Sequence, residues 1–310
     1  MRARCRKVAR TNQKRQKERS EEAAVVSNPI ITLTSLVAAS MGLQLGMVAL
    51  FQHRKKGLVR IMKESAIVLT GLKAPRDAFK VAMGVEQEKD EKIDALMEMT
   101  FGKVIEIFAE SIPSILIQLS ATMNAIESGG IGAISRTMLL SLLISAITTG
   151  FVSATISYDY DTSPKSRANK ADFYGYISDS PTTRALMFLT LMCISTCQVM
   201  LKSLFLVALG HIGTSHVSLY FGIDVGAYIL ILSLRGDFVL WVPNEGWSTY
   251  AMSFFARIII KVVADFTSCV QLRHPNLTGG LYFTANLFTP LIGIISMLSF
   301  AGEETFNEET

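Results

Sequence analysis

Long apolar runs alternate with short polar segments along most of the chain. A transmembrane helix needs about 20 predominantly apolar residues, and runs of this length predict membrane-crossing helices. Seven runs meet this description, at residues 30–51, 101–124, 131–158, 185–210, 217–234, 250–270 and 279–300. The pattern predicts an all-α fold, a polytopic transmembrane helix bundle of about six to seven spans within residues 29–300.

Three polar segments flank or interrupt this bundle. Residues 1–28 read as a disordered basic tail, with nine Lys/Arg in the first 19 positions, and residues 301–310 read as an acidic tail. Residues 58–84 are amphipathic, with basic side chains at helical spacing, which is typical of a juxtamembrane helix on an anionic surface. A solvated helix in a cytosolic loop fits this segment equally well.

Basic residues in the loops predict the orientation of the bundle. The loops 52–100, 158–184 and 235–248 hold fifteen Lys/Arg, whereas the opposite loops hold two. Basic loops remain in the cytosol, so the first set is expected there. A single crossing by 30–51 would place the basic tail outside. The alternatives are a re-entrant hairpin bending near Gly42 and Gly46, a return of 58–72 through the membrane, or a translocated tail.

Composition supports a membrane protein and narrows its chemistry. Hydrophobic residues make up 50% of the chain and charged residues 18%, and the mean hydropathy is +0.36. These values suit an integral membrane protein better than a soluble domain. No phosphate-binding glycine loop, paired-histidine motif or zinc-ligand spacing stands out. The sequence therefore predicts no enzyme, cofactor or metal, and no recognition fold for nucleic acid accompanies the basic tail.

The run 101–124 combines span length with a polar stripe. At 100° per residue, five of its polar side chains fall within an arc of about 120°: Lys103, Glu106, Glu110, Ser114 and Gln118. The proline within this run removes a backbone donor and kinks a helix. The candidate groove residues here are Lys103, Glu106, Glu110, Pro113 and Gln118.

Three other runs carry ionisable residues, which are costly inside a membrane and normally face protein, water or a transported species. These residues are Lys202, Asp224, Arg257, Lys261 and Asp265. The simplest arrangement pairs Glu106 or Glu110 with Lys261 or Arg257, and Lys202 with Asp224. Such pairs could fix helix packing alone, or they could line a polar groove through the bundle.

The run 131–158 carries Ser or Thr at every fourth position from Ser141 to Ser157. Small residues on one helix face allow a second helix to approach closely. This ridge predicts helix packing rather than a polar pathway.

The segment from Glu110 to Gln118 resembles the E-x-x-P-x-x-x-x-Q signature of the XK-related family, with Pro113 at the motif proline and Ser114 where that family usually has Gln. The order upstream is also similar: a span, a basic juxtamembrane helix and a charged linker. The chain is also similar to uncharacterised multi-pass proteins of microbial eukaryotes, at GLK (71–73) and ISYDYD (156–161). The first resemblance implies a multi-pass, scramblase-like or transport-associated protein.

The expected function is movement of lipid or solute across the bilayer through a polar intramembrane groove, with phospholipid scrambling as one form of it. An ion- or proton-coupled transporter or channel, with Glu110 and Asp224 as titrating sites, is a second hypothesis. A non-transporting membrane scaffold subunit is a third. The expected partners are membrane lipids, with anionic headgroups at the basic segments, and the pattern is compatible with a homo- or hetero-oligomer.

Overall fold

The computed structural model describes residues 29–52, 58–70, 76, 95–169, 171–177, 180–235, 247–269 and 288–295. All regular structure in these ranges is helical, which confirms the all-α fold class. Residues 288–295 are also helical. The other elements are α2 (Pro29–Gln52), α3 (Leu58–Leu69), α5 (Ala95–Glu106), the π-helix η1 (Ile107–Ser111), α6 (Ile112–Gly129), the 3₁₀ turn η2 (Ile131–Ala133), α7 (Arg136–Thr162), α8 (Pro164–Asn169), α9 (Pro181–Ile212), α10 (Thr214–Arg235) and α11 (Trp247–Thr267).

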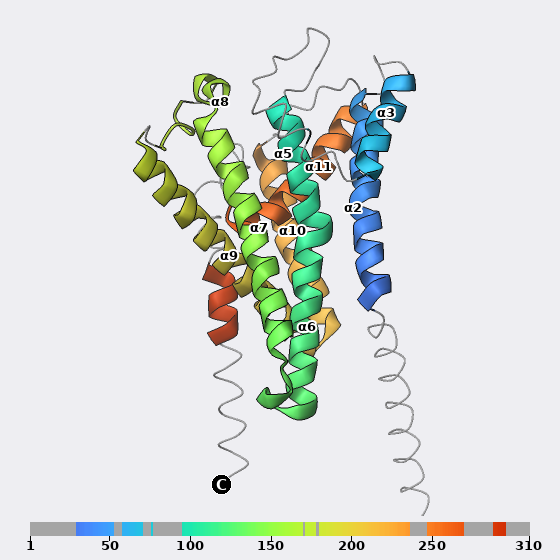
Figure 1. Cartoon of the computed structure of the whole chain (residues 1–310), viewed down its shortest axis with the longest axis vertical. Helices are drawn as coiled ribbons and strands as arrows, with labels where there is room; N and C mark the ends of the chain where they lie inside the picture. Colours follow the sequence, from blue (N-terminus) through green and yellow to red (C-terminus); the bar gives the residue numbers. More distant parts are fainter. Residues whose placement is uncertain are drawn as a thin grey trace, which may run out of the picture.

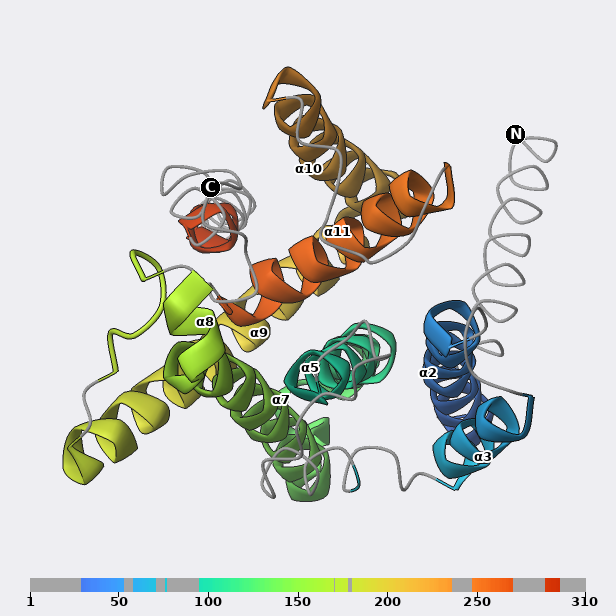
Figure 2. The ribbon, with the colours of Figure 1, turned by 90° about the horizontal axis from the view of Figure 1, so that it is seen from above.

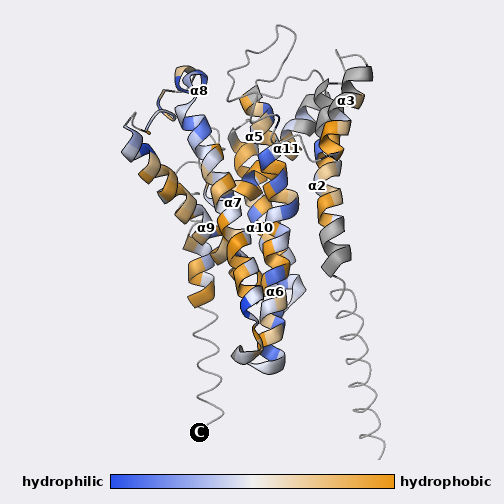
Figure 3. Ribbon diagram, in the orientation of Figure 1, coloured by the Kyte–Doolittle hydropathy of each residue, from blue (hydrophilic) through white to orange (hydrophobic). Residues whose placement is uncertain are grey.

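Within the described ranges, four helices are long and apolar enough to cross a membrane. They are Leu96–Gly129, Arg136–Thr162, Pro181–Ile212 and Thr214–Leu234. The first is one continuous helix made of α5, η1 and α6. Orange, apolar residues recur along these helices, interspersed with white and blue ones (Figure 3). A membrane protein is therefore supported by helix length and composition, for four of the six to seven predicted spans.

Helix α9 occupies the centre of the bundle. It packs most extensively on α7 and also contacts α6, α10 and α11. Seen from above, α7 and the α5–η1–α6 helix lie on one side of the bundle, and α10 and α11 lie on the other (Figures 1 and 2). Helix α2 lies at the outside and contacts η1.

Local sequence signals set several helix ends. The side chain of Ser135 accepts a hydrogen bond from the Met138 N–H (3.2 Å) at the start of α7, as an N-cap residue does. Pro181 opens α9, where its missing N–H would have no helical acceptor. Gly130, with φ +69°, closes α6 in a conformation that glycine adopts readily.

Helix α2 corrects one expectation for the first run. The helix passes through Gly42 and Gly46 without interruption, so the hairpin bending there is wrong. Helix α3 packs on α2 and lies alongside its upper part (Figures 1 and 2). Its twelve residues cover about 18 Å, which is too short to cross the bilayer again. Both tails, and all of 71–84 except residue 76, lie outside the described residues.

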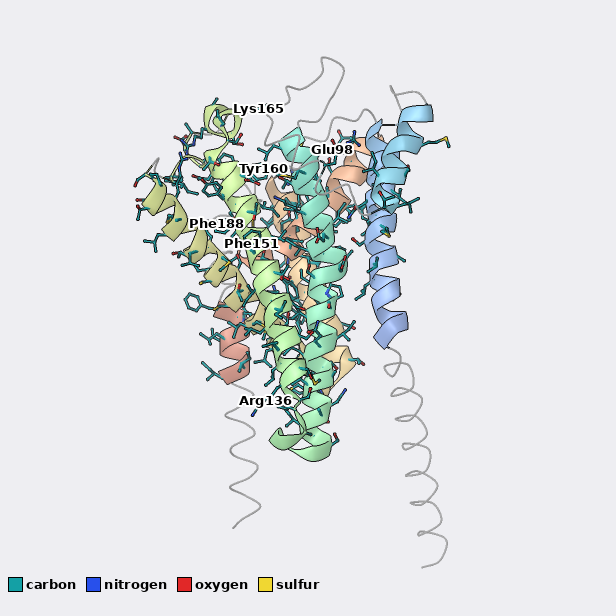
Figure 4. All side chains as sticks on the ribbon, in the orientation of Figure 1. Glu98, Arg136, Phe151, Tyr160, Lys165 and Phe188 are labelled. Carbon is teal, nitrogen blue, oxygen red and sulfur yellow. The ribbon has the colours of Figure 1, made fainter. Side chains whose placement is uncertain are left out.

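The described loops fit the predicted orientation. Helix α3, the start of α5 and helix α8 lie at the upper end of the bundle, and η2 lies at the lower end (Figure 1). The upper end therefore carries parts of the two most basic predicted cytosolic loops. Figure 4 places Lys165 at this upper end and Arg136 at the lower end.

The contact between α7 and α9 confirms the packing role of the small-residue ridge. Ser195 Oγ donates to Ser153 Oγ (3.2 Å), and both serines are buried. A Cβ at Gly150 would lie 2.9 Å from the Met192 carbonyl oxygen, so the two helices touch here at backbone distance. Outside this contact, Phe151 packs edge-on against Phe188 at 5.4 Å (Figure 4).

The chain after α7 is held by the buried carboxylate of Asp161. This side chain accepts hydrogen bonds from the N–H groups of Gly175 (3.1 Å), Tyr176 (3.3 Å) and Ile177 (2.8 Å). Gly175 has φ +97°, a conformation that L side chains rarely adopt. The loop is thereby fixed against the end of α7.

Tyr174 lies beside this anchor and stacks on Tyr160 with ring centroids 5.9 Å apart. Burial, with smaller contributions from Cys269 and Asp161, raises the pKa of Tyr174 to about 12. Burial disfavours the charged phenolate. The Tyr174 hydroxyl therefore stays protonated throughout the physiological pH range.

Candidate functional site

Helix α11 turns a charged stripe toward the protein interior. Ser253, Arg257, Lys261 and Asp265 recur every four residues, and each is at most 4% exposed. On the opposite face, Phe255 is 62% exposed. A helix with buried charges and exposed aromatic rings is the reverse of a helix facing water, and it fits a helix whose outer face meets lipid.

Helix α11 also differs from its neighbours in direction. The helix is strongly inclined to the long helices. In the view from above its length extends across the picture, and in the side view it covers little height (Figures 1 and 2). It is followed by Ser268, a non-glycine residue with φ +55°, and by the buried Cys269, which contacts Ser157 of α7 (3.1 Å). The predicted run 250–270 is thus helical, but it is not among the four helices apolar enough to cross a membrane.

Lys261 links two helices at the centre of this stripe. Its Nζ donates to Asp265 Oδ2 (2.7 Å) on its own helix and to Asp224 Oδ2 on α10. The same ammonium lies 5.8 Å from the ring centroid of Tyr228. The expected pairing of Lys261 with Glu106 or Glu110 is therefore wrong, since its carboxylate partners are the two aspartates. We call Asp224, Tyr228, Lys261 and Asp265 the ionic cluster.

Lys202 of α9 lies near the end of α11. Its side chain is almost fully buried. Lys202 Nζ lies 5.2 Å from the ring centroid of Phe266 and 6.0 Å from the ring centroid of Tyr220. Aromatic faces attract cations at this range. Phe266 belongs to the last turn of α11, where the helix dipole also favours a positive charge. Asp224, the expected partner of Lys202, forms an ion pair with Lys261.

The polar stripe of the predicted groove crosses a π turn. In η1 the N–H of Ile112 bonds to the carbonyl of Ile107, one residue further back than in an α-helix. Pro113 follows at once, and a proline ring clashes with the carbonyl four residues earlier in a regular helix. The π turn accommodates this proline without breaking the helix. Glu110 lies within this turn and Glu106 directly before it, both half-buried.

The two ends of the stripe face α7. Lys103 Nζ pairs with Asp159 Oδ2 (3.3 Å), and Gln118 Nε2 donates to Ser145 Oγ (3.1 Å). Gln118 also donates to Ser114 (3.1 Å), and its buried Oε1 has no hydrogen-bond partner among the described residues. Among those residues, neither Glu106 nor Glu110 forms an ion pair. We call Lys103, Glu106, Glu110 and Gln118 the α7-facing stripe, after the contacts that its two ends make with α7.

The structure thus divides the ten predicted site residues between two places. Lys103, Glu106, Glu110, Pro113 and Gln118 belong to the α5–η1–α6 helix, and Lys202, Asp224, Arg257, Lys261 and Asp265 gather around α11. The two groups are neighbours, because α11 contacts both α5 and η1. No three His, Cys, Asp or Glu side chains in the described ranges are placed to hold a metal ion.

Sequence reasoning missed several partners. Tyr228 lies one helical turn after Asp224, and that spacing could have singled it out. Asp159 and Asp161 were assigned to a polar loop, although both lie in the last turn of α7. His211 Nδ1 pairs with Glu127 Oε1 (3.0 Å) and joins α9 to α6, a contact between residues far apart in the chain that no local pattern indicates.

In comparisons with known proteins, no protein-family model, curated protein or solved structure matches the chain.

Proposed function

We propose that the chain moves lipid headgroups or another polar solute across a bilayer without covalent chemistry, along the α7-facing stripe. The observation that carries the proposal is the pair of half-buried carboxylates, Glu106 and Glu110, at a π turn within a membrane-length helix. Ionisable side chains at such depth normally face the protein interior, water or a transported species. Single π turns in α-helices also occur frequently at functional sites.

The length of the stripe suits this function. Lys103 and Gln118 are about 22 Å apart along the helix, which is most of the ~30 Å hydrocarbon thickness. Polar side chains recur nearly every turn between them. A headgroup crossing the bilayer needs such repeated polar contacts, because an unpaired polar group in hydrocarbon costs several kcal/mol.

Lipid scrambling by the purified chain in liposomes tests the proposal. With a fluorescent phospholipid and dithionite, bleaching beyond the outer-leaflet half is expected for the wild type. Glu110→Gln keeps the shape of the side chain and removes its charge, so bleaching of the inner leaflet should slow at least tenfold. Bleaching that stops at the outer leaflet for folded wild-type protein contradicts lipid movement.

Glu127→Gln is the matched control. Glu127 lies on the same continuous helix, but it is exposed and pairs with His211. Its neutralisation should leave the bleaching rate unchanged. Equal slowing by Glu110→Gln and Glu127→Gln would show an effect of net charge and not of the stripe.

The ionic cluster supports a second candidate, an ion- or proton-coupled transporter. Two carboxylates from different helices share the Lys261 ammonium, and such intramembrane groups mark ion and proton pathways in many transporters. This candidate requires a flux that depends on pH and that disappears in Asp224→Asn. A flux that is independent of pH across the range where carboxylates titrate would leave only the first candidate.

We propose in addition that the basic segments bind anionic lipid headgroups. The support for this association is the excess of Lys and Arg over Asp and Glu, which is nine to three in residues 1–28 and five to two in residues 58–84. It predicts tighter association with vesicles that contain phosphatidylserine than with neutral vesicles, and a loss of this preference at high salt.

A further inference from the structure

The surroundings of the Lys261 ammonium have the composition of a binding site for an alkylammonium group. Asp265 Oδ2 lies 2.7 Å from Nζ, Asp224 supplies a second carboxylate oxygen, and the Tyr228 ring centroid lies 5.8 Å away. An ammonium has three N–H donors and no acceptor. Carboxylates accept these hydrogen bonds, and an aromatic face attracts the cation. The protein's own lysine occupies this arrangement in the structure.

The site has two halves on different helices. Asp265 lies one turn from Lys261 on α11, so it stays with the lysine if α11 and α10 separate. Asp224 and Tyr228 lie one turn apart on α10, and both contact the same ammonium. Helix α10 therefore carries one carboxylate and one aromatic ring, which together can bind an ammonium without α11.

Helix α10 is the least embedded of the four membrane-length helices. Its apolar stretch is 11% buried, against 39% to 44% for the other three. Within the described core, Tyr228 and Leu232 form a small cluster apart from the main one. The Asp224 side chain is 15% exposed, whereas Lys261 and Asp265 are 2% and 1% exposed. Asp224 is thus the more accessible carboxylate of the site, whereas the Tyr228 ring beside it is buried.

We propose that Asp224 and Tyr228 bind the ammonium group of a transported species, and that Lys261 fills this half-site when the species is absent. The inference rests on the transport function proposed for the ionic cluster and names the chemistry of its substrate. Exchange of one ammonium for another preserves the ion pair and the ring contact, so it avoids leaving a buried carboxylate alone. The ammonium could belong to a lipid headgroup, such as ethanolamine, or to a free amine.

Thermal unfolding of the purified full chain with methylammonium chloride tests binding without requiring transport. In nanodiscs of phosphatidylglycerol, whose headgroup has no ammonium, methylammonium should raise the unfolding midpoint by about 2–4 °C more than sodium chloride at equal ionic strength. Equal shifts with the two salts overturn the proposal. Because transport is measured separately, liposomes that show no flux leave this result standing.

Variants of α10 assign the shift to the site. Tyr228→Leu should lose the methylammonium shift, and Tyr228→Phe, which keeps the ring, should retain it. Tyr220→Leu is the matched control, because Tyr220 lies on the same helix but faces Lys202. A full shift in Tyr228→Leu, or equal losses in Tyr228→Leu and Tyr220→Leu, overturns the assignment.

The nanodisc lipid identifies the source of the ammonium. If lipid headgroups occupy the site, phosphatidylethanolamine nanodiscs should abolish the methylammonium shift by competition. If a free amine is the ligand, the shift should be the same in both lipids. Both results require the shift in phosphatidylglycerol and therefore support the site.

Discussion

Two helix contacts in the bundle, which we call the α7–α9 seam and the α10–α11 seam, use polar residues in opposite ways. Between α7 and α9, polar contact is made by small neutral groups, with Gly150 at backbone distance and Ser153 bonded to Ser195. Between α10 and α11, contact is made through Lys261, which holds a carboxylate from each helix. The first seam brings helices together closely, and the second joins them through charges that are costly to bury.

The energetic scale of the two seams differs accordingly. A hydrogen bond between membrane helices contributes about 0.6 kcal/mol on average. Removing one partner of a buried ion pair costs about 3–5 kcal/mol, although replacing the whole pair by apolar residues is often neutral. Small neutral residues like those of the α7–α9 seam are therefore sufficient for close packing of two helices. Charges at the α10–α11 seam indicate a requirement beyond packing.

The largest effect is expected for Lys261→Leu. This change leaves the carboxylates of Asp224 and Asp265 without the ammonium between them, and we expect a loss of about 3–5 kcal/mol in the free energy of unfolding. Unfolding in nanodiscs, followed by helical circular dichroism, measures it. Replacing all three residues, as Asp224→Leu, Lys261→Met and Asp265→Leu, should restore most of the stability. If the triple variant is as unstable as the single one, the cost does not arise from unpaired charge.

A smaller effect is expected for Gly150→Ala. The new Cβ would meet the Met192 carbonyl oxygen and the Thr196 nitrogen, backbone atoms that move only if α7 and α9 separate. Overpacking of this kind costs about 1–3 kcal/mol. Gly222→Ala on α10 is the matched control, since no described atom lies within 4 Å of its Cβ position. Equal effects of the two substitutions on the unfolding midpoint would contradict the close approach of α7 and α9.

The smallest effect is expected for the serine pair. Ser153→Ala and Ser195→Ala remove the two ends of one hydrogen bond, so a double-mutant cycle should give a coupling free energy of about 0.6 kcal/mol. Denaturant unfolding of the four proteins measures it. A coupling free energy as large as the cost expected for Lys261→Leu would contradict the proposed energetic difference between the α7–α9 and α10–α11 seams.

Local pattern and run length predicted the parts of this structure that depend on near neighbours in the chain. The runs that became α7, α9 and α10 were recognisable from their length, and the packing ridge around Ser153 from its spacing of four. The partners of Lys261 were not predictable in this way. They depend on the inclination of α11 and on which helix lies beside it, and both are set by tertiary packing. The π turn was also missed, although Pro113 marked where the regular helix had to change.

That π turn has a consequence for insertions and deletions. Between the two contacts with α7, Gln118 lies 15 positions after Lys103, while Asp159 lies only 14 positions after Ser145. The π turn accommodates the one extra residue. Both contacts with α7 are therefore kept, although this helix is one residue longer than α7 between them. A chain lacking one residue of Ile107–Ser111 would need Pro113 replaced as well, because in a regular α-helix the proline ring would clash with the carbonyl four residues earlier. With both changes the helix could keep its two end contacts with α7, and the residues of the former π turn, Glu110 among them, would change direction while Lys103 and Gln118 would not.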